Sequence, residues 1–527
     1  MLRRSALVLT LILLPSSLAA EPPGVWALVG GRVHPVASPP IENGTVVIRD
    51  GLIEAVGARV AIPPDAVVVE VEGLNVYPGL FDAHTTFGLP RRERSGGAAR
   101  ESREEPAAAE PTASTEAARL VTLTADALDA RRATGVTTVL TVPREGNFNG
   151  QSAILNLGEG EIGALILRAP ASTHVSFNTK TWGRFPDSLM GAIYHARQTL
   201  LDAQWLVRAR EIYDRDPRGR RRPEASPDLD ALAPALRREI PVVFSASDQV
   251  RIRRAADIGR EMGLRWIVSG ATEAWELGDL LAAAKAPVLF SVEFPRKPGI
   301  APEDQSLREI RDRVLAPTGP AELARRNVEF ALVSGPSLPP RGFIDGVRRS
   351  IENGLDEQAA LRAVTLTPAR IFGLDRQIGS LEPGRIANVL VTEKKFWEKD
   401  AKVRHLFIDG LEMRLPAEKE DEAEASAPAE GTWDLTIRMP EGEVFMQVVL
   451  STAGDQVTGS YSGDRGSGSI REGSVEGERV SFSIAAPTAP GGETSDWRFS
   501  GTVEGNSIDG EVVTSLGTFA FTGRKPE

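Results

Sequence analysis

The sequence predicts an α/β protein whose central part is a (β/α)8 barrel of the TIM type, with β-rich segments on both sides. Three observations support this fold class. Short apolar segments alternate repeatedly with amphipathic helices from residue 76 to 374, which is typical of a parallel sheet covered by helices. The segments flanking this region alternate apolar and polar residues, as half-buried strands do. The last hundred residues alternate in the same way between Gly, Asn and Asp turns.

Residues 1–20 are predicted to be a signal peptide. Arg3 and Arg4 precede an apolar run from Ala6 to Leu14, and small residues follow it, which permits cleavage after Ala19 or Ala20. The apolar run is too short for the about 20 helical residues that cross a bilayer. We therefore expect an exported protein, periplasmic or secreted, that does not span a membrane.

Residues 21–75 and 375–415 both have the residue pattern that is typical of antiparallel sheet. The first segment contains "GTVVIRDGLIEAVGARV" and "AVVVEVEGLNV", with turns at "ENG" and "RDG". The second contains "QIGSLEPGRIANVLVTEK" and "VRHLFIDGLEM". Apolar residues alternate with polar ones in each, so we expect short strands with one buried face.

Residues 76–374 are predicted to form the barrel. "GVTTVLTVP", "IPVVFSAS", "LRWIVSG", "APVLFSV" and "VEFALVSG" are its clearest strands, and "DQVRIRRAADIGREMG" is one of its helices. An open doubly wound sheet is the alternative, but no G-x-G-x-x-G turn follows a strand. Residues 91–114 form a low-complexity loop. The Gly- and Asn-rich stretch Glu145–Leu157 is expected to be a ligand-facing loop or a tight turn after the second strand.

Residues 416–430 are predicted to be a linker, and residues 431–527 a separate all-β module. The linker is rich in charged residues, Ala and Pro, and offers no core. The module consists of regularly spaced alternating strands, which predict a small barrel or sandwich.

Composition excludes several classes of function. The net charge of −11 opposes binding to nucleic acid through the overall field of the protein. The absence of cysteine removes disulfides, thiolate metal sites and cysteine nucleophiles. No G-x-S-x-G motif is present, so the sequence gives no support to serine hydrolase chemistry.

The stretch "VYPGLFDAHTTFGLP" at the end of the first barrel strand resembles the amidohydrolase superfamily, in particular its imidazolonepropionase-like members. Those proteins carry a "PGL-D-x-H-x-H" segment at this place. "AALRAVTLTPARIFGLDRQIGSLEPGRIANVLV" is similar to the C-terminal signature of the family, in which the chain leaves the barrel and rejoins the N-terminal sheet. The resemblance therefore implies a small composite β-sandwich built from both flanks of the barrel.

The resemblance also implies a metal site at the strand ends, and this chain departs from it. His84 matches the first histidine of strand 1, but Thr86 stands at the second. Ser245 or Ser247 stands at the end of strand 5 where a histidine is expected, and "VSGATEAW" after strand 6 contains none. Where the family has an aspartate after strand 8, the chain has serines and a glycine, including Ser334 and Ser337. Hydroxyl groups are poor ligands for zinc or iron. We therefore predict no cofactor, and zinc or another divalent metal only in an unusual site.

Asp82, Glu145, Asp248 and Glu273 complete the candidate pocket. Glu293 is a further carboxylate near a strand end and is not part of that predicted pocket. Paired carboxylates at a barrel mouth can act as acid and base, but acidic residues that begin a helix more often cap it. His174, near Lys180, is the remaining candidate for an unusual metal ligand, and His84 itself is expected to be a buried, hydrogen-bonded histidine.

Two functions follow from these features. The resemblance implies a hydrolase of C–N bonds other than peptide bonds, in an amide or a cyclic amide, with a degenerate metal site. Alternatively, it is a non-catalytic barrel that binds a small molecule or acts as the partner of an active relative. The sequence leaves enzymatic activity, the substrate and a homo- or hetero-oligomeric state open.

Overall fold

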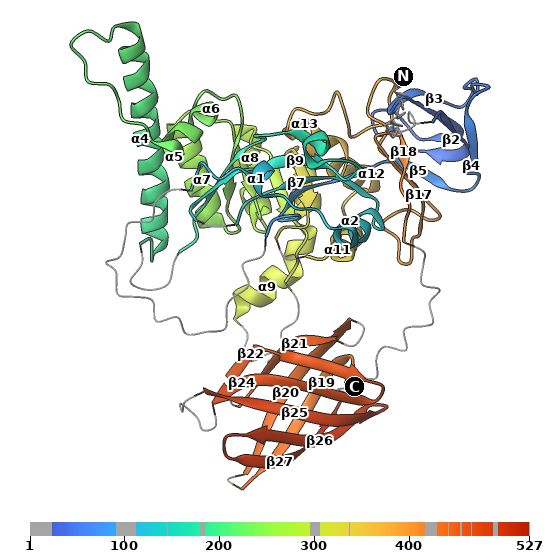
Figure 1. Ribbon diagram of the computed structural model, residues 1–527, viewed down its shortest axis with the longest axis vertical. Coiled ribbons are helices and arrows are strands. Elements are labelled where there is room, and N and C mark those ends of the chain that lie inside the picture. The colour runs from blue at the N-terminus through green and yellow to red at the C-terminus, as the bar shows by residue number, and fades with distance from the viewer. Residues whose placement is uncertain are drawn as a thin grey trace, which may run out of the picture. The chain divides into compact units, whose positions relative to one another are not determined.

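The computed structural model describes residues 24–90, 112–144, 146–179, 185–295, 306–336, 338–416, 429–440, 442–453, 456–464, 466–487 and 494–525 (Figure 1). The chain divides into two compact units, Met1–Pro295 with Asp312–Pro416, and Arg296–Arg311 with Ala417–Glu527. The predicted signal peptide, most of the loop 91–114 and most of the linker lie outside the described residues, as do Glu145, Lys180 and Ser337.

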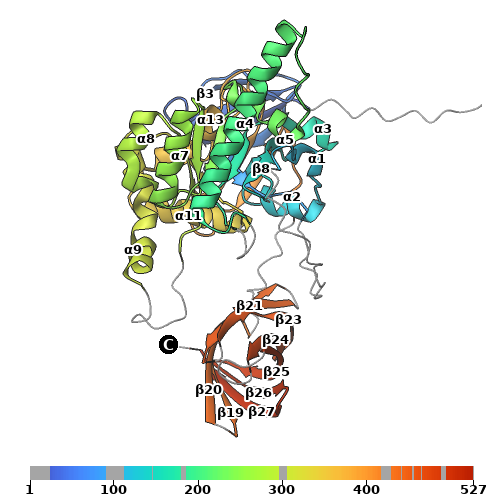
Figure 2. The same cartoon turned by 90° about the vertical axis from the view of Figure 1, so that its left-hand side faces the viewer.

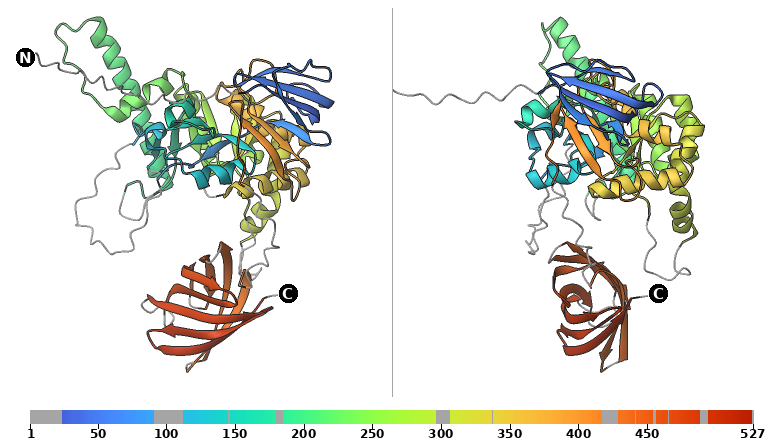
Figure 3. Two further views of the ribbon diagram at one scale, coloured as in Figure 1. Left: turned by 45° about the vertical axis from the view of Figure 1, so that its right-hand side comes forward. Right: turned by 90° about the vertical axis from the view of Figure 1, so that its right-hand side faces the viewer.

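Strands from both sides of the barrel segment pair in one eight-stranded sheet (Figure 3). Its strands are β1 (Trp26–Val33), β2 (Ile41–Arg49), β3 (Leu52–Gly57), β4 (Val67–Glu70), β5 (Asn75–Pro78), β16 (Val389–Thr392), β17 (Val403–Ile408) and β18 (Leu411–Glu412). Strand β16 runs antiparallel to β5, with Val391 opposite Val76. Both valines are fully buried, so the junction is apolar. The sandwich form of this part stays a prediction.

The centre of the first unit is a TIM-barrel-like arrangement of strands covered by helices. The parallel strands are β6 (Leu80–Thr85), β7 (Val136–Thr141), β11 (Thr173–Ser176), β12 (Val242–Ser245), β13 (Trp266–Ser269), β14 (Val288–Ser291) and β15 (Phe330–Val333). Inside, one buried cluster takes a residue from nearly every strand: Phe81, Leu140, Ile154, Val243, Ile267, Leu289 and Ala331. These apolar strands correspond to the runs in the sequence, because strands covered on both faces need apolar residues throughout.

The helices follow the strands along the chain (Figure 2). They are α1 (Ala117–Leu120), α2 (Ala125–Arg132), α3 (Ile162–Leu165), α4 (Leu189–Arg215), α5 (Pro227–Ala231), α6 (Ala233–Leu236), α7 (Gln249–Glu261), α8 (Gly278–Ala284), α9 (Leu307–Leu315), α10 (Gly319–Arg325), α11 (Pro340–Glu352), α12 (Glu357–Ala363) and α13 (Leu366–Ile371), with a short strand β10 (Ile166–Arg168) and 3-10 turns at Ala274–Leu277 and Ala316–Thr318. Among the described helices, none combines the length and the apolar character needed to cross a bilayer.

One position of the barrel is occupied by an antiparallel segment, which corrects the prediction for Glu145–Leu157. Strands β8 (Phe148–Gln151) and β9 (Ala153–Asn156) lie between β7 and β11 and run antiparallel to both. All eight residues are buried. The polar side chains at this site are hydrogen-bonded; Asn147 Nδ2, for example, donates to the carbonyls of Ser176 (3.1 Å) and Asn178 (2.9 Å). Such partners make burial of an Asn-rich strand tolerable.

The barrel and the shared sheet are joined by a buried polar cluster. Asn156 Nδ2 donates to Asp409 Oδ1 at 2.8 Å, and Asn388 Nδ2 donates to Asn156 Oδ1 at 2.7 Å. Burial raises the pKa of Asp409, and the Asn156 hydrogen bond partly offsets this effect. Because the cluster unites three segments distant in sequence, it fixes how the returning chain meets the barrel.

The C-terminal unit is a closed nine-stranded β-barrel. Its strands are β19 (Gly431–Met439), β20 (Gly442–Ala453), β21 (Gln456–Gly463), β22 (Gly466–Ser469), β23 (Arg471–Glu476), β24 (Arg479–Pro487), β25 (Thr494–Glu504), β26 (Ser507–Thr514) and β27 (Gly517–Arg524). Pairing of β20 with β21, in addition to the linear order from β20 to β22, closes the ring. Trp433, Trp497, Phe482 and Phe499 fill its core. Of the two forms predicted for this module, the structure has the barrel.

Candidate functional site

A pocket of about 240 Å³ opens at the carboxyl ends of the barrel strands. The residues that line it are His84, Ser247, Gly270, Thr272, Ser291, Glu293, Val333, Gly335 and Pro336. They follow or terminate β6, β12, β13, β14 and β15, which is the face of a TIM barrel where functional residues collect. Glu293 supplies the carboxylate among these described residues, and the remaining polar groups are hydroxyls, one imidazole and backbone.

Serine occurs at the carboxyl end of five adjacent strands, from β11 to β15. The five are Ser176, Ser245, Ser269, Ser291 and Ser334. The register places Ser176 opposite Ser245, and Ser245 opposite Ser269. A serine hydroxyl is uncharged at neutral pH and can both donate and accept a hydrogen bond. Apart from Glu293, the barrel mouth therefore presents mainly neutral polar groups.

His84 contacts one of these serines. Its Nδ1 atom is hydrogen-bonded to Ser269 Oγ, across the barrel from β6 to β13. Burial lowers the pKa of His84 to about 4, although the negative charge of Asp82 opposes the shift. At neutral pH the imidazole is therefore uncharged, and one of its two nitrogens is already engaged.

His174 on β11 lies beside His84, with 5.8 Å between the ring centroids. Its Nε2 atom and Ser172 Oγ are 2.9 Å apart. The Nδ1 atom is buried without a hydrogen-bond partner. Burial, and to a smaller extent the neighbouring His84, holds the pKa of His174 well below its ordinary value. The two rings thus form a neutral pair under the mouth of the barrel.

The other histidines lie elsewhere. His34 stacks on Tyr77 in the shared sheet, with 4.4 Å between centroids. His405 is 2.7 Å from Glu412 in the same sheet. His195 on α4 lies between the rings of Phe148 and Phe185, whose centroids are 6.0 and 5.7 Å away. In the described part of the chain, no group of three His, Cys, Asp or Glu residues is placed to hold a metal ion.

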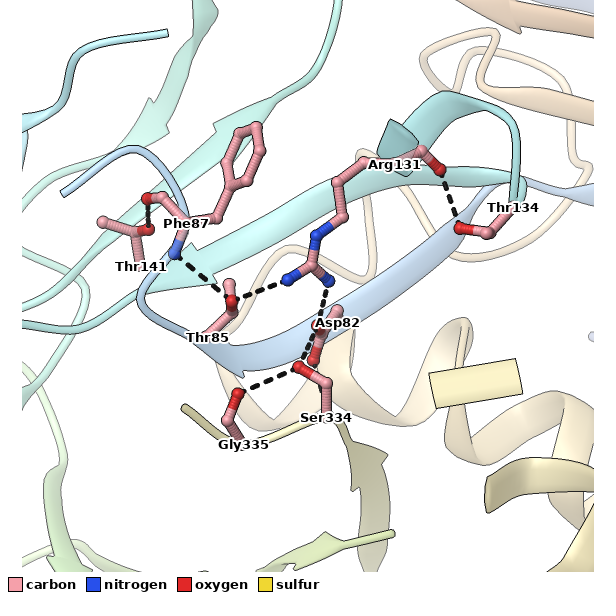
Figure 4. A network of polar contacts seen from close by, with 8 residues as sticks. All are labelled: Asp82, Thr85, Phe87, Arg131, Thr134, Thr141, Ser334 and Gly335. Atoms are coloured by element: carbon pink, nitrogen blue, oxygen red, sulfur yellow. Dashed lines mark hydrogen bonds and ion pairs between the residues drawn. The ribbon is translucent and has the colours of Figure 1, made fainter. Parts of the chain in front are cut away.

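Asp82 belongs to a buried network that connects the first and last barrel strands (Figure 4). Arg131 Nη1 donates to Asp82 Oδ2 at 2.7 Å, and Arg131 Nη2 donates to Thr85 Oγ1 at 3.0 Å. Ser334 donates to the same carboxylate through its backbone N (3.0 Å) and its Oγ (2.6 Å). Asp82 is fully buried and does not line the pocket. Its position indicates a role in holding the barrel closed.

Thr86 lies at the rim of the barrel. Arg144, which follows β7, donates from Nη2 to Thr86 Oγ1 and, at 2.9 Å, to the carbonyl of Pro336. Pro336 is one of the residues that line the pocket. The second position of the His-x-Thr pair is therefore occupied by a hydroxyl that binds an arginine.

Asp248 and Glu273 both serve the amino end of α7. Asp248 is its N-cap and accepts from the backbone N of Arg251 at 2.9 Å. Glu273 Oε2 accepts from the backbone N of Gln249 at 3.0 Å. These carboxylates satisfy backbone N–H groups that a helix start leaves unpaired. Neither lines the pocket.

Sequence reasoning missed four residues that shape this site: Arg131, Arg144, Ser269 and Ser291. Serine at the ends of successive apolar runs was a readable signal, in "VVFS", "WIVS" and "VLFS". No local pattern marks the two arginines, because their partners lie 49 and 58 positions away in the sequence.

Comparisons with known proteins agree with this architecture. Residues 333–413 match the model of the amidohydrolase family. Adenine deaminase from Clostridium botulinum is 34% identical over 84 residues, which are 15% of this chain and 14% of that protein. Adenine deaminase from Archaeoglobus fulgidus is 39% identical over 72 residues, 13% of this chain and 12% of that protein. The chain thus matches these curated relatives over far less than two thirds of their length.

A solved structure matches over a larger part of the chain. An amidohydrolase from Thermotoga maritima MSB8 is 25% identical and superposes with a TM-score of 0.63, over 74% of this chain and all of that one. The match of the carboxyl-terminal signature, the TIM-barrel-like strands and the sheet shared by both flanks agree with one another. The chain is thus similar to the amidohydrolase superfamily, both in its carboxyl-terminal signature and in its fold.

Proposed function

We propose that this protein is an exported member of the superfamily that binds a small polar molecule at the mouth of its barrel and does not carry out metal-dependent hydrolysis. The observation that supports this most directly is the row of serines at the strand ends beside His84, where no group of three His, Cys, Asp or Glu residues among those described is placed to hold a metal ion. Export is proposed from the amino-terminal sequence alone, "MLRRSALVLTLILLPSSLAA".

The donor atoms at the mouth do not fit the divalent metals, such as zinc, that amidohydrolases generally use. Tight binding of zinc takes about three or four protein ligands at about 2.0–2.3 Å. His84 and His174 are neighbours, and a serine contacts one nitrogen of each ring, so the pair supplies at most two ligands through the remaining nitrogens. Asp82, the adjacent carboxylate, is committed to Arg131 and Ser334. Metal-dependent hydrolysis is therefore not part of the function that we propose.

The pocket itself suits a small ligand with N–H donors. Its volume of about 240 Å³ equals that of roughly eight waters at about 30 Å³ each. Glu293 offers a carboxylate, and Ser247, Thr272 and Ser291 offer hydroxyls. An ionised carboxylate accepts hydrogen bonds and donates none. An amine, amide or amidine on the ligand, which has N–H donors, would therefore match it.

Hydrolysis of a C–N bond in an amide or cyclic amide is the second candidate function. It is favoured by lineage and by the presence of His84 and Glu293 in one pocket. An imidazole with a pKa of about 4 is a weak general base at neutral pH, since catalytic groups work best with a pKa near the operating pH. We therefore rank binding above turnover.

Elemental analysis of the purified protein tests the proposal. We expect no stoichiometric zinc, iron, manganese or nickel, and no change in melting temperature on adding a chelator. A bound metal stabilises the folded state by mass action, so a genuine site would give a clear shift. The proposal would be overturned by about one bound metal ion per chain that is lost in His84→Ala and kept in His405→Ala.

A pair of glycine variants tests binding in the pocket. Gly335 has φ of +73°, and a Cβ there would lie 3.2 Å from Ser291 Oγ and 3.8 Å from Glu293 Oε2. Gly354 also has a positive φ, of +99°, but a Cβ there meets only Ala321, at 3.9 Å. In a thermal-shift screen of small amides and amines, Gly335→Ala should abolish the response to a hit, and Gly354→Ala should retain it. Equal responses in both variants would place the ligand elsewhere.

A further inference from the structure

Helix α4 has one face packed on the barrel unit. It contains 27 residues, which makes it about 40 Å long at about 1.5 Å per residue, and Figures 1 and 2 show it extending beyond the neighbouring helices. Its buried residues are Ala192, Ala196, Thr199, Leu200, Ala203 and Leu206. These mostly small side chains let the helix lie close to its neighbours along one side.

The opposite face of α4 exposes large apolar side chains. Met190 is 81% exposed, Tyr194 61%, Trp205 67% and Ile212 41%. Leu201 lies between them and is half-buried, since part of its side chain packs against the apolar cluster beneath α4. We call these five residues the α4 stripe. At about 100° per residue they fall within a sector about 60° wide, opposite the buried face. Single exposed apolar residues are ordinary, but several large ones on one helix face, here interrupted by Arg197 and Arg208, mark an interaction surface.

We propose that the α4 stripe is the contact surface for a second copy of this chain, with two α4 helices packed antiparallel about a two-fold axis at Leu201. Two-fold dimers use the same patch on both copies, so the patch must be complementary to itself. The spacing of residues along α4 meets this condition. In an antiparallel pair centred on Leu201, positions equally distant from it on either side face each other.

The facing positions match in chemistry. Met190 and Ile212 are equally distant from Leu201, and they would pair as apolar residues at both ends of the stripe. Each aromatic residue would face an arginine of the second copy. Tyr194 is matched with Arg208, and Trp205 with Arg197, whose guanidinium edge pairs with Glu261 of the same copy and whose planar face is the part that would stack. Arginine stacks favourably on aromatic faces, so both pairs are attractive.

Charge and shape also agree with this arrangement. Asp187, just before the helix, is matched with Arg215 at its last residue, and both are exposed. Antiparallel helices place each positive amino end beside a negative carboxyl end, which is favourable. Since the barrel packs on the face of α4 opposite the stripe, the two barrel units would lie on opposite sides of the helix pair.

The expected dimer is reversible. A helix face about 40 Å long and about 10 Å wide covers roughly 400 Å² on each copy, below the about 800 Å² per partner of a standard interface. We therefore expect a monomer–dimer equilibrium in the micromolar range of the full chain, to be measured by sedimentation velocity.

Exposed apolar residues provide a matched pair of variants for that measurement. Trp205→Glu places a carboxylate in the centre of the interface and should weaken dimerisation at least tenfold. Val250→Glu is the control, because Val250 is 54% exposed on helix α7, outside the stripe, and it should dimerise as the unmodified chain does. Circular dichroism checks that both variants are folded. A chain that stays monomeric to 100 µM, or equal effects of the two substitutions, would overturn the proposal.

Cross-linking tests the two-fold register. The chain has no cysteine, so Leu201→Cys introduces a single thiol, which should lie beside its own copy and give a covalent dimer on oxidation. Ile212→Cys faces Met190 of the second copy and should remain monomeric on a reducing-agent-free gel. A dimer linked by Ile212→Cys and not by Leu201→Cys would contradict the antiparallel register.

Charge reversal gives an independent reading of the same register. Arg215→Asp should weaken the dimer, because it would face Asp187, and adding Asp187→Arg should restore it. Failure of the double variant to recover would exclude this pairing.

Discussion

Replacement of Arg131 by methionine should destabilise the barrel unit strongly, because it removes the cation from a buried network. The substitution keeps much of the side-chain volume but leaves Asp82 fully buried, with hydrogen bonds from Ser334 and no ion pair. Removing one partner of a buried ion pair typically costs about 3–5 kcal/mol, since the remaining charge cannot return to water. We expect a loss of about 4 kcal/mol in the free energy of unfolding.

A second substitution separates the charge from the packing. The double variant Asp82→Asn with Arg131→Met removes both charges, so the uncompensated carboxylate is gone. It should be more stable than Arg131→Met alone by about 2 kcal/mol, because the buried carboxylate without a cation, which costs about 3–5 kcal/mol, is no longer present. Additive losses would mean that the network contributes through volume and not through charge.

Calorimetry or urea unfolding of the full chain measures these differences. Arg254→Met is the control, because the Arg254 ion pair with Asp257 is exposed, at 57% and 53%, and exposed pairs contribute only about 0–1 kcal/mol. If Arg131→Met and Arg254→Met lowered stability by the same amount, the assignment of Asp82 to a structural network would be wrong.

Three further predictions concern the pH response, the amino terminus and the domain boundary. The pKa of His84 is lowered to about 4 in the folded chain, whereas a histidine in an unfolded chain titrates near 6.5. Between these two pH values only the unfolded state binds a proton at this residue. The free energy of unfolding therefore decreases as the pH falls through this range. This loss of stability is at most about 3 kcal/mol. The free energy of unfolding, measured by urea titration between pH 7 and 4.5, should fall less steeply in His84→Gln than in the unmodified chain. The control His405→Gln should show the same decline as the unmodified chain. Intact-mass analysis after expression in an exporting host should give a chain beginning near Ala20 or Glu21, and retention of residues 1–19 would refute the signal peptide. Residues 430–527 expressed alone should give the far-ultraviolet spectrum and cooperative melting of a β-protein, and residues 21–416 should also remain folded without them; two unfolded fragments would contradict the boundary.

The parts of the fold that could be predicted are those with a local signal. Runs such as Val242–Ser245 and Val288–Ser291 are apolar throughout because they are covered on both faces. The helix cap at Asp248 is equally local, since its side chain accepts from a backbone N only three residues on. These features depend on residues that are close together in the sequence, so the sequence alone predicts them.

The parts that could not be predicted depend on distant partners. Phe148–Gln151 has the composition of a turn, and its burial depends on carbonyl groups of other segments that satisfy Asn147. The position of Asp82 in the sequence predicts a pocket residue. Its carboxylate instead forms an ion pair with Arg131, which lies 49 residues further along the chain. The contact of His84 with Ser269 spans 185 residues. No periodicity or spacing encodes such pairs.

The sheet shared by the two flanks has a consequence for the order of folding during synthesis. Strand β5 pairs with β16, more than three hundred residues later in the chain. At about 5–20 residues per second, the ribosome delivers the missing strands roughly 15–60 s after β5 has appeared. Throughout that interval the edge of β5 and the apolar face containing Val76 have no native cover, which favours aggregation or holding by a chaperone. Completion of the sheet is therefore among the last steps of folding, and a chain truncated before residue 389 should be the form that aggregates first.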